Sequence, residues 1–262
     1  MTGRHARRSF FVVALIVFWS VASTTSASAK EPQQQAAKRA SMPDLTGVWT
    51  PGPGSGNGGN IFRRGNEPPM TAWGQARFNE NKPSFGPRAV SESNNPTFDC
   101  FPPGVPQIYF YPLLVELVQL PNKVIQIFEY DHTVRYIYTD GRPHPSAEEW
   151  TPTYMGHSIG HYEGDTLVVD TVGFNGKTWL DRVGHAHSDQ LHLIERFRRV
   201  DEETLQISMT IEDPKAYTKP GQSEFIYKFK PKWDVGEYVC QDNIDFAHKF
   251  YEKSVNPGQP AK

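Results

Sequence analysis

Two carboxylates interrupt apolar, alternating segments of this 262-residue sequence. Glu195 falls on the apolar face of one such segment, and Glu129 follows two alternating isoleucines in another. If these faces point into the protein interior, each carboxylate needs a cationic partner or must stay protonated. Arg135 is one candidate counter-ion, and Arg142 is the alternative.

His157 shares its alternation with an isoleucine, so we expect it to point inward as well. The pattern therefore predicts a polar cluster of Glu129, Arg135, His157 and Glu195 inside the fold. The cluster could orient a bound ligand together with His192, or fix strand register as a buried ion pair. It could also do acid–base chemistry, with His157 or His192 as the base and Glu195 as its partner.

Histidines that lie close together in the sequence could form a metal site. His157 and His161 are four residues apart on an expected strand, which separates their Cα atoms by roughly 13 Å, so they cannot both coordinate one metal ion. His185 and His187 are two residues apart, roughly 7 Å if extended, and they are the weak candidates for a chelating pair.

Such a pair would still need a third ligand, such as His132 or His192, and no recognisable spacing supplies one. We therefore expect no metal and no other cofactor.

The elements that must position these side chains are mostly strands. A first strand is expected over residues 44–49. From Tyr109 onward, alternation of period two predicts strands over 114–119, 124–130, 134–138, 155–162, 166–171, 192–200, 205–211 and 224–229, with a short last strand at 237–240. Short turn-forming links join most of them, which favours an antiparallel meander that closes into a barrel. No βαβ spacing appears, so a parallel sheet is not expected.

Segments outside the strands complete the expected architecture. Residues 51–106 hold ten prolines and a glycine-rich run, which predicts long loops with one short helix at 71–79. A C-terminal helix is expected over 241–253. We interpret 44–253 as a single all-β domain, flanked by disordered segments at 30–43 and 254–262.

Composition limits the class of protein. The chain is 37% hydrophobic and 13% aromatic, which excludes a wholly disordered protein. Its net charge of -2 offers no basic field, so we expect no nucleic-acid partner.

The N-terminus indicates export. Residues 1–29 combine Arg4, Arg7 and Arg8, an apolar stretch at 10–21, and a small-residue cleavage site at 27–29, which is typical of a signal peptide. Removing these three arginines would change the net charge from -2 to -5. We expect a periplasmic or extracellular protein without a membrane span in the mature chain, exported by the general secretory or the twin-arginine route.

Export also bears on the two cysteines, Cys100 and Cys240. An oxidising compartment favours a disulfide between them, and two buried free thiols are the alternative.

Gly47-Val48-Trp49 on the first expected strand, a strand meander and a final helix together resemble the lipocalin (calycin) plan. Residues 99–243 also resemble a family of uncharacterised exported bacterial proteins. The stretches that carry this second resemblance include 155–160, 163–170, 187–188, 195–197 and 213–214. The resemblance implies a lipocalin-like barrel and implies no particular activity.

Three functions fit these observations. The first is an exported barrel that binds a small, mostly apolar organic ligand in its lumen, oriented by the polar residues named above. The second is a hydrolase, lyase or isomerase that uses a His/Glu pair in the same cavity. The third is an envelope interaction protein with a packed core. An open lumen would favour the first two, and a packed lumen the third.

Overall fold

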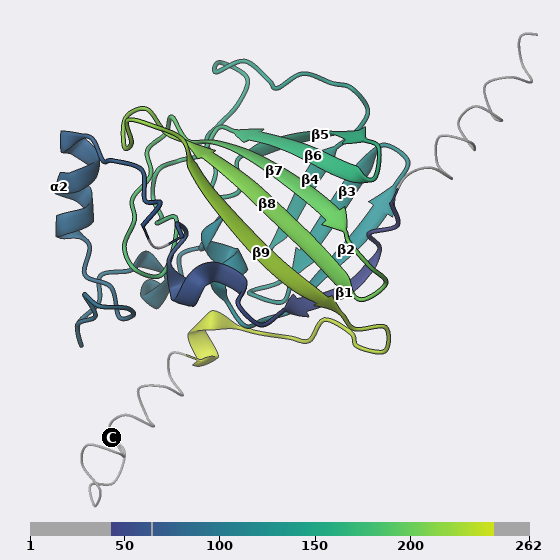
Figure 1. Ribbon diagram of the computed structural model, residues 1–262, viewed down its shortest axis with the longest axis horizontal. Helices are drawn as coiled ribbons and strands as arrows, with labels where there is room; N and C mark the ends of the chain where they lie inside the picture. The colour runs from purple at the N-terminus through teal and green to yellow at the C-terminus, as the bar shows by residue number, and fades with distance from the viewer. Residues whose placement is uncertain (1–42, 64, 244–262) are drawn as a thin grey trace, which may run out of the picture. The chain divides into compact units, whose positions relative to one another are not determined.

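The computed structural model describes residues 43–63 and 65–243, and Figure 1 shows their arrangement. Nine strands form a closed barrel in chain order. The strands are β1 (Gly47–Pro51), β2 (Val115–Leu120), β3 (Lys123–Phe128), β4 (Val134–Tyr138), β5 (His157–Glu163), β6 (Thr166–Val172), β7 (His192–Arg199), β8 (Thr204–Glu212) and β9 (Gly221–Phe229). The expected all-β barrel is therefore confirmed.

The meander is broken at one seam. All neighbouring strands pair antiparallel except β4 and β5, which pair in parallel at only two positions, Ile137 with Ser158 and Tyr138 with Ile159. The expectation of a purely antiparallel meander is wrong here. The long connection 139–156 crosses back over the barrel, so β5 starts from the same end as β4.

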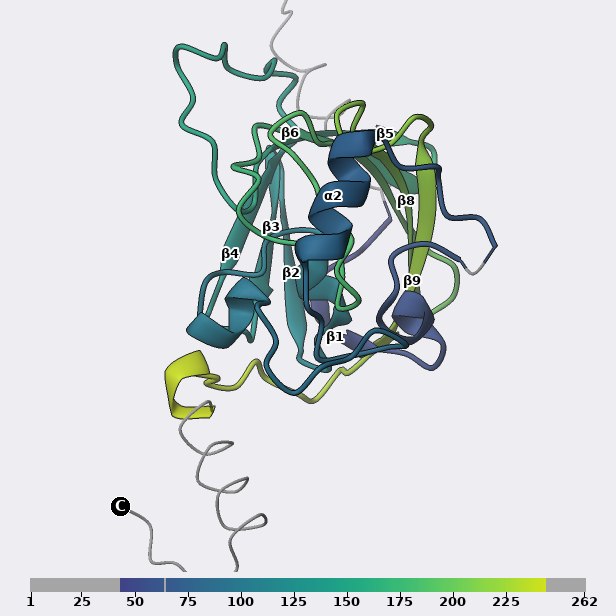
Figure 2. The same cartoon turned by 90° about the vertical axis from the view of Figure 1, so that its left-hand side faces the viewer.

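The long segment between β1 and β2 covers one end of the barrel (Figure 2). It contains η2 (Ser55–Gly59), α2 (Ala72–Glu80), η3 (Pro96–Asp99) and η4 (Gln107–Phe110). The helix expected at 71–79 is thus confirmed as α2. The Thr71 hydroxyl caps it by accepting the Gly74 N–H at 3.1 Å.

The barrel interior is filled with aromatic and aliphatic side chains. Tyr109 enters it from η4, is 1% exposed, and packs against Phe128 and Phe225 with ring centroids 5.8 and 5.4 Å apart. Trp49 and Phe197 are also buried. The barrel lumen is thus a packed core.

The C-terminal part differs from expectation in one respect. Residues 237–240 form no strand; Tyr238 makes an isolated parallel bridge to Tyr130. A helix begins at Cys240 and continues to Asn243, where the described residues end. The rest of the helix expected over 241–253 lies outside them, as do the signal peptide at 1–29, most of the linker at 30–43 and the tail at 254–262.

A disulfide joins Cys100 to Cys240, with Cα atoms 5.7 Å apart. It ties the end of η3 to the start of the last helix, so the expected bridge is confirmed. In residues 43–63 and 65–243, no helix is both long and apolar enough to cross a membrane.

Candidate functional site

Arg135 and Glu195 meet inside the barrel, as the sequence predicted. Arg135 points inward from β4 and Glu195 from β7; they are 2% and 0% exposed. The guanidinium Nη1 donates to Glu195 Oε1 at 3.1 Å, and Nη2 forms a shorter hydrogen bond to Glu195 Oε2. Tyr109 from η4 donates its hydroxyl to the same carboxylate at 2.8 Å.

Every remaining donor of Arg135 is also occupied. Nε donates to Ser158 Oγ at 3.0 Å, Nη1 to Gln126 Oε1 at 3.0 Å, and Nη2 to Thr171 Oγ1 at 2.8 Å. A guanidinium has five N–H groups, and here none is left for a ligand. Burial alone would lower the pKa of Arg135, but Glu195 and Tyr109 together outweigh burial and hold that pKa above its ordinary value. This network is a buried ion pair that ties β3, β4, β5, β6 and β7 together.

Glu129 and His157 do not join this network, and their expected inward orientation is wrong. Glu129 shares the face of Ile125 and Ile127, as predicted, but that face of β3 is the outer one. Its carboxylate accepts the backbone N–H of Leu114 at 2.8 Å. On β5 it is Ser158 that points inward, so its neighbour His157 points outward.

His192 also points outward, since its neighbour Leu193 is buried in the core. The prediction that Glu195 orients His157 or His192 is therefore wrong, because the barrel wall separates the carboxylate from both rings. Arg142, the alternative counter-ion, pairs instead with Asp140 on the surface.

His185 and His187 lie in the loops at the covered end of the barrel, and they do not converge on one point. His185 Nδ1 lies 2.5 Å from Asp181 Oδ2, and His187 Nδ1 donates to the Ser188 carbonyl at 2.9 Å. Within the described ranges, no three His, Cys, Asp or Glu side chains are arranged to hold a metal ion.

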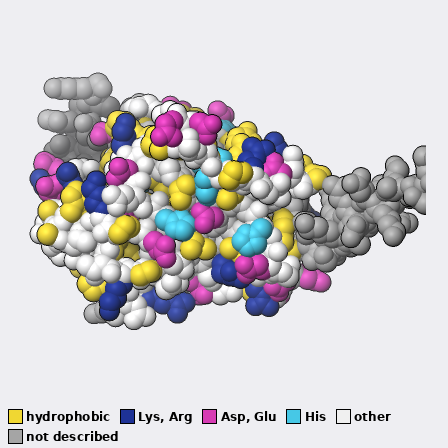
Figure 3. All heavy atoms as spheres, turned by 90° about the horizontal axis from the view of Figure 1, so that it is seen from above, with side chains coloured by type: hydrophobic (Ala, Val, Ile, Leu, Met, Phe, Trp, Pro, Cys, Tyr) yellow, Lys and Arg dark blue, Asp and Glu magenta, His cyan; other side chains and the backbone are white. Residues whose placement is uncertain are grey.

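The outward-pointing residues form a continuous hydrogen-bonded row across β5 to β8, which we call the histidine row. Its members, in order, are His157, His144, Asp170, His192 and Glu212. The His157 and His144 Nδ1 atoms are 2.8 Å apart, and His144 Nε2 is 2.9 Å from Asp170 Oδ1. His192 Nε2 is 3.0 Å from Asp170 Oδ2, and its Nδ1 is 3.1 Å from Glu212 Oε2. Figure 3 shows histidine and acidic side chains side by side on this face.

The charges within the row follow from its contacts. Both nitrogens of His192 face carboxylate oxygens, which only accept, so the doubly protonated ring satisfies both contacts. The hydrogen bond to Asp170 accordingly raises the pKa of His192, and the same bond lowers the pKa of Asp170. Burial lowers the pKa of His157, with His144 and Arg142 as further causes, which favours a neutral ring.

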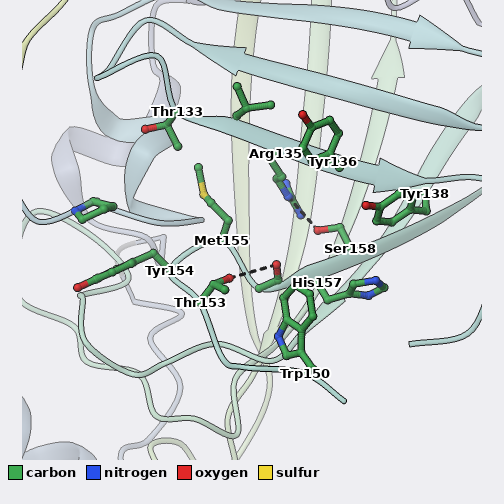
Figure 4. Close-up of a pocket in the computed structure, with 13 residues that line it drawn as sticks. Thr133, Arg135, Tyr136, Tyr138, Trp150, Thr153, Tyr154, Met155, His157 and Ser158 are labelled. Carbon is green, nitrogen blue, oxygen red and sulfur yellow. Dashed lines mark hydrogen bonds between the residues drawn. The ribbon is translucent and has the colours of Figure 1, made fainter. Parts of the chain in front are cut away.

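His157 also lines a pocket of about 380 Å³ on the β4–β5 seam, which we call the seam pocket. Figure 4 shows its labelled residues. The pocket is lined by Pro102, Thr133, Val134, Arg135, Tyr136, Tyr138, Trp150, Thr153, Tyr154, Met155, Gly156, His157 and Ser158. Most of these present aromatic or other apolar surface.

The pocket exists because β4 and β5 separate beyond their two paired positions. Hydrogen bonds from Phe128 N to Thr133 O (2.8 Å) and from Thr139 N to Asn122 O (2.9 Å) set the alternation along the β3–β4 hairpin. By this alternation, Val134 directs its backbone N–H and C=O away from β3, toward the seam. This end of β4 borders the pocket instead of a neighbouring strand.

Compared with protein families, curated proteins and solved structures, the chain matches none of them. The resemblance to lipocalins and to exported bacterial proteins therefore stays a prediction.

Several residues of the histidine row and of the buried network were not predicted from the sequence. Asp170 ends the apolar run 167–169, and that intrusion of a charge into a strand was a usable signal. His144 lies in the long crossover, where no periodicity exists to place it. The sequence around Tyr109 indicates only an apolar packing residue. Its position inside the barrel shows that its hydroxyl belongs to the Arg135–Glu195 network.

Proposed function

We propose that this protein binds a small, flat, mostly apolar organic molecule in the seam pocket. The observation that carries the proposal is the pocket itself, about 380 Å³ and lined by aromatic rings beside a few polar groups. Concave, largely apolar sites with few polar groups are typical of small-molecule sites. The proposal keeps the ligand class expected from the sequence and moves the ligand from the lumen to the barrel wall.

The filled lumen and the saturated Arg135 support this change of place. A ligand inside the barrel would have to displace packed rings such as Tyr109 and break a hydrogen-bonded ion pair, both at high free-energy cost. A packed lumen also fits an envelope interaction protein. The seam pocket favours ligand binding over that alternative because its aromatic rings already line a concave site.

Trp150 is the residue expected to contribute most to binding. Its indole donates to the Gly173 carbonyl at 3.2 Å, which fixes the ring at the pocket wall. Stacking on a fixed aromatic ring contributes about 0.5–1.5 kcal/mol beyond area burial. We also propose that the protein acts after export, in the periplasm or outside the cell, in keeping with its disulfide and the leader expected at 1–29.

Naphthol, a flat aromatic with one hydroxyl, is a suitable probe because its own fluorescence reports binding. We expect saturable binding to the wild-type protein and about tenfold weaker binding to Trp150→Ala, a loss of about 1.4 kcal/mol. Trp233→Ala is the matched control, since Trp233 is 54% exposed and lies outside the pocket lining. Equal affinity of the wild-type and Trp150→Ala proteins, or no saturable binding, would refute the proposal.

A further inference from the structure

We propose that His157 Nε2 is a general base that removes a proton from a ligand held in the seam pocket. This inference rests on the proposed function and specifies its substrate class. The class is small, planar carbon acids, in which a C–H bond is made acidic by an adjacent carbonyl or C=N group.

The hydrogen-bonded row determines which nitrogen of His157 is basic. Asp170 is a carboxylate and only accepts, so His144 carries its proton on Nε2. When both rings are neutral, His144 therefore has its lone pair on Nδ1. His157 Nδ1 lies 2.8 Å from that atom and must donate its own N–H to it. Neutral His157 therefore has its lone pair on Nε2.

The surroundings leave that lone pair available. The His157 ring lies beside Tyr138 and Trp150 at one end of the pocket, with ring centroids 5.6 and 5.0 Å away (Figure 4). Nε2 has no hydrogen-bond partner among residues 43–63 and 65–243. The two aromatic rings and the bond to His144 hold the imidazole in one orientation, as a catalytic base requires.

The proton transfer balances without any co-reactant. The substrate C–H bond breaks, its proton goes to Nε2, and the electron pair moves into the adjacent carbonyl as an enolate. Return of the proton at a second carbon gives an isomer, whereas loss of a leaving group gives an elimination product.

The groups around the ring can stabilise the protonated base of this step. The imidazolium formed on His157 keeps its Nδ1–H bond to His144, which in turn is bonded to the Asp170 carboxylate. Arg142 is a cation on the same face; its guanidinium lies 4.0 Å from the centre of the Tyr138 ring and pairs with Asp140.

Nitrobenzisoxazole tests the assignment directly. It is a planar carbon acid whose ring opens when a base removes its C–H proton: the N–O bond breaks and a coloured cyanophenolate is released. We expect saturable turnover faster than that of free imidazole at the same concentration. We expect a loss of roughly 100-fold or more in kcat/KM for His157→Gln.

His161→Gln is the matched control and should keep wild-type turnover, because His161 lies on the same strand, is exposed, and pairs with Glu163. His144→Phe tests the positioning residue. It should lower kcat while leaving KM unchanged, since the ring shape remains but the acceptor that fixes the His157 tautomer is lost.

The outcomes separate this inference from the proposed function. Saturable binding of nitrobenzisoxazole without turnover above imidazole would overturn the base and leave the ligand site standing. No binding would overturn both.

An independent test is nitrogen-15 NMR of the histidine rings at a pH where both His144 and His157 are neutral. We expect protons on His144 Nε2 and on His157 Nδ1. A proton on His157 Nε2 would overturn the assignment whatever the turnover.

Discussion

Replacing Glu195 by Gln tests whether the buried network holds the barrel together. Gln keeps the shape of the side chain and removes its charge, so the Arg135 guanidinium stays in the core without a counter-ion. The amide also puts a donor where the guanidinium needs an acceptor. Breaking a buried ion pair by removing one partner costs about 3–5 kcal/mol. For a domain of this size, that corresponds to a Tm lower by roughly 6–20 °C.

Urea unfolding of the oxidised protein, followed by circular dichroism, measures this change in the free energy of unfolding. Glu163→Gln is the matched control, because Glu163 pairs with Arg196 on the outer face at 2.6 Å and both side chains are about half exposed. It should unfold at the wild-type urea concentration.

A double-mutant cycle then tests the coupling within the pair. Arg135→Met should cost less in the Glu195→Gln background than in the wild type, because the guanidinium has already lost its partner. A Glu195→Gln protein as stable as the Glu163→Gln control would refute the reasoning, and the inward register of β7 with it.

Three further predictions concern stability. Reduction of the disulfide, whose cysteines are 140 positions apart, should lower the free energy of unfolding by about 5 kcal/mol in the chain-entropy model; an unchanged urea midpoint after reduction would contradict this. Gly74→Ala should destabilise by about 1–3 kcal/mol in the same assay although alanine favours helices, because a Cβ there would lie 2.1 Å from the Ala216 carbonyl oxygen; a gain in stability would show that α2 does not pack there. His192→Gln should lower the free energy of unfolding at pH 5.5, and by progressively less as the pH rises to 8.5. The hydrogen bond to Asp170 raises the pKa of His192 in the folded protein, so the stabilisation is full below about pH 6.5 and is lost as the pH passes that raised pKa. A loss of stability that does not vary with pH, or the same pH dependence in His161→Gln, would rule this out.

The sequence determined the local structure well. Period-two alternation located the strands from β2 to β9, because a half-buried strand must alternate its side chains whatever it packs against. The short helix expected at 71–79 formed as α2, and the structure shows the Thr71 hydroxyl capping its first turn. The disulfide followed from two cysteines in a chain expected to be exported. The sequence also predicted that Arg135 and Glu195 form an ion pair, because a carboxylate on a buried apolar face needs a cation.

Only the tertiary structure decided which face of each strand is the inner one. On β3 the face with Ile125 and Ile127 is as apolar as the face with Val124 and Phe128, so alternation alone could not orient Glu129. The same ambiguity applied to β5, where the structure shows that Ser158, and not His157, points inward. A shift of one residue exchanges the two faces, and nothing local to the strand resists it.

The seam pocket and the histidine row were beyond the reach of the sequence for a related reason. The row joins residues from position 144 to position 212, and no local pattern specifies contacts between five separate segments. The pocket depends on the parallel pairing of β4 and β5, and the long crossover 139–156 imposes this pairing. The short links between the other strands favour antiparallel pairing, so they did not indicate it. Long-range contacts of this kind depend on how the whole barrel closes, so they are decided only when all the strands are in place.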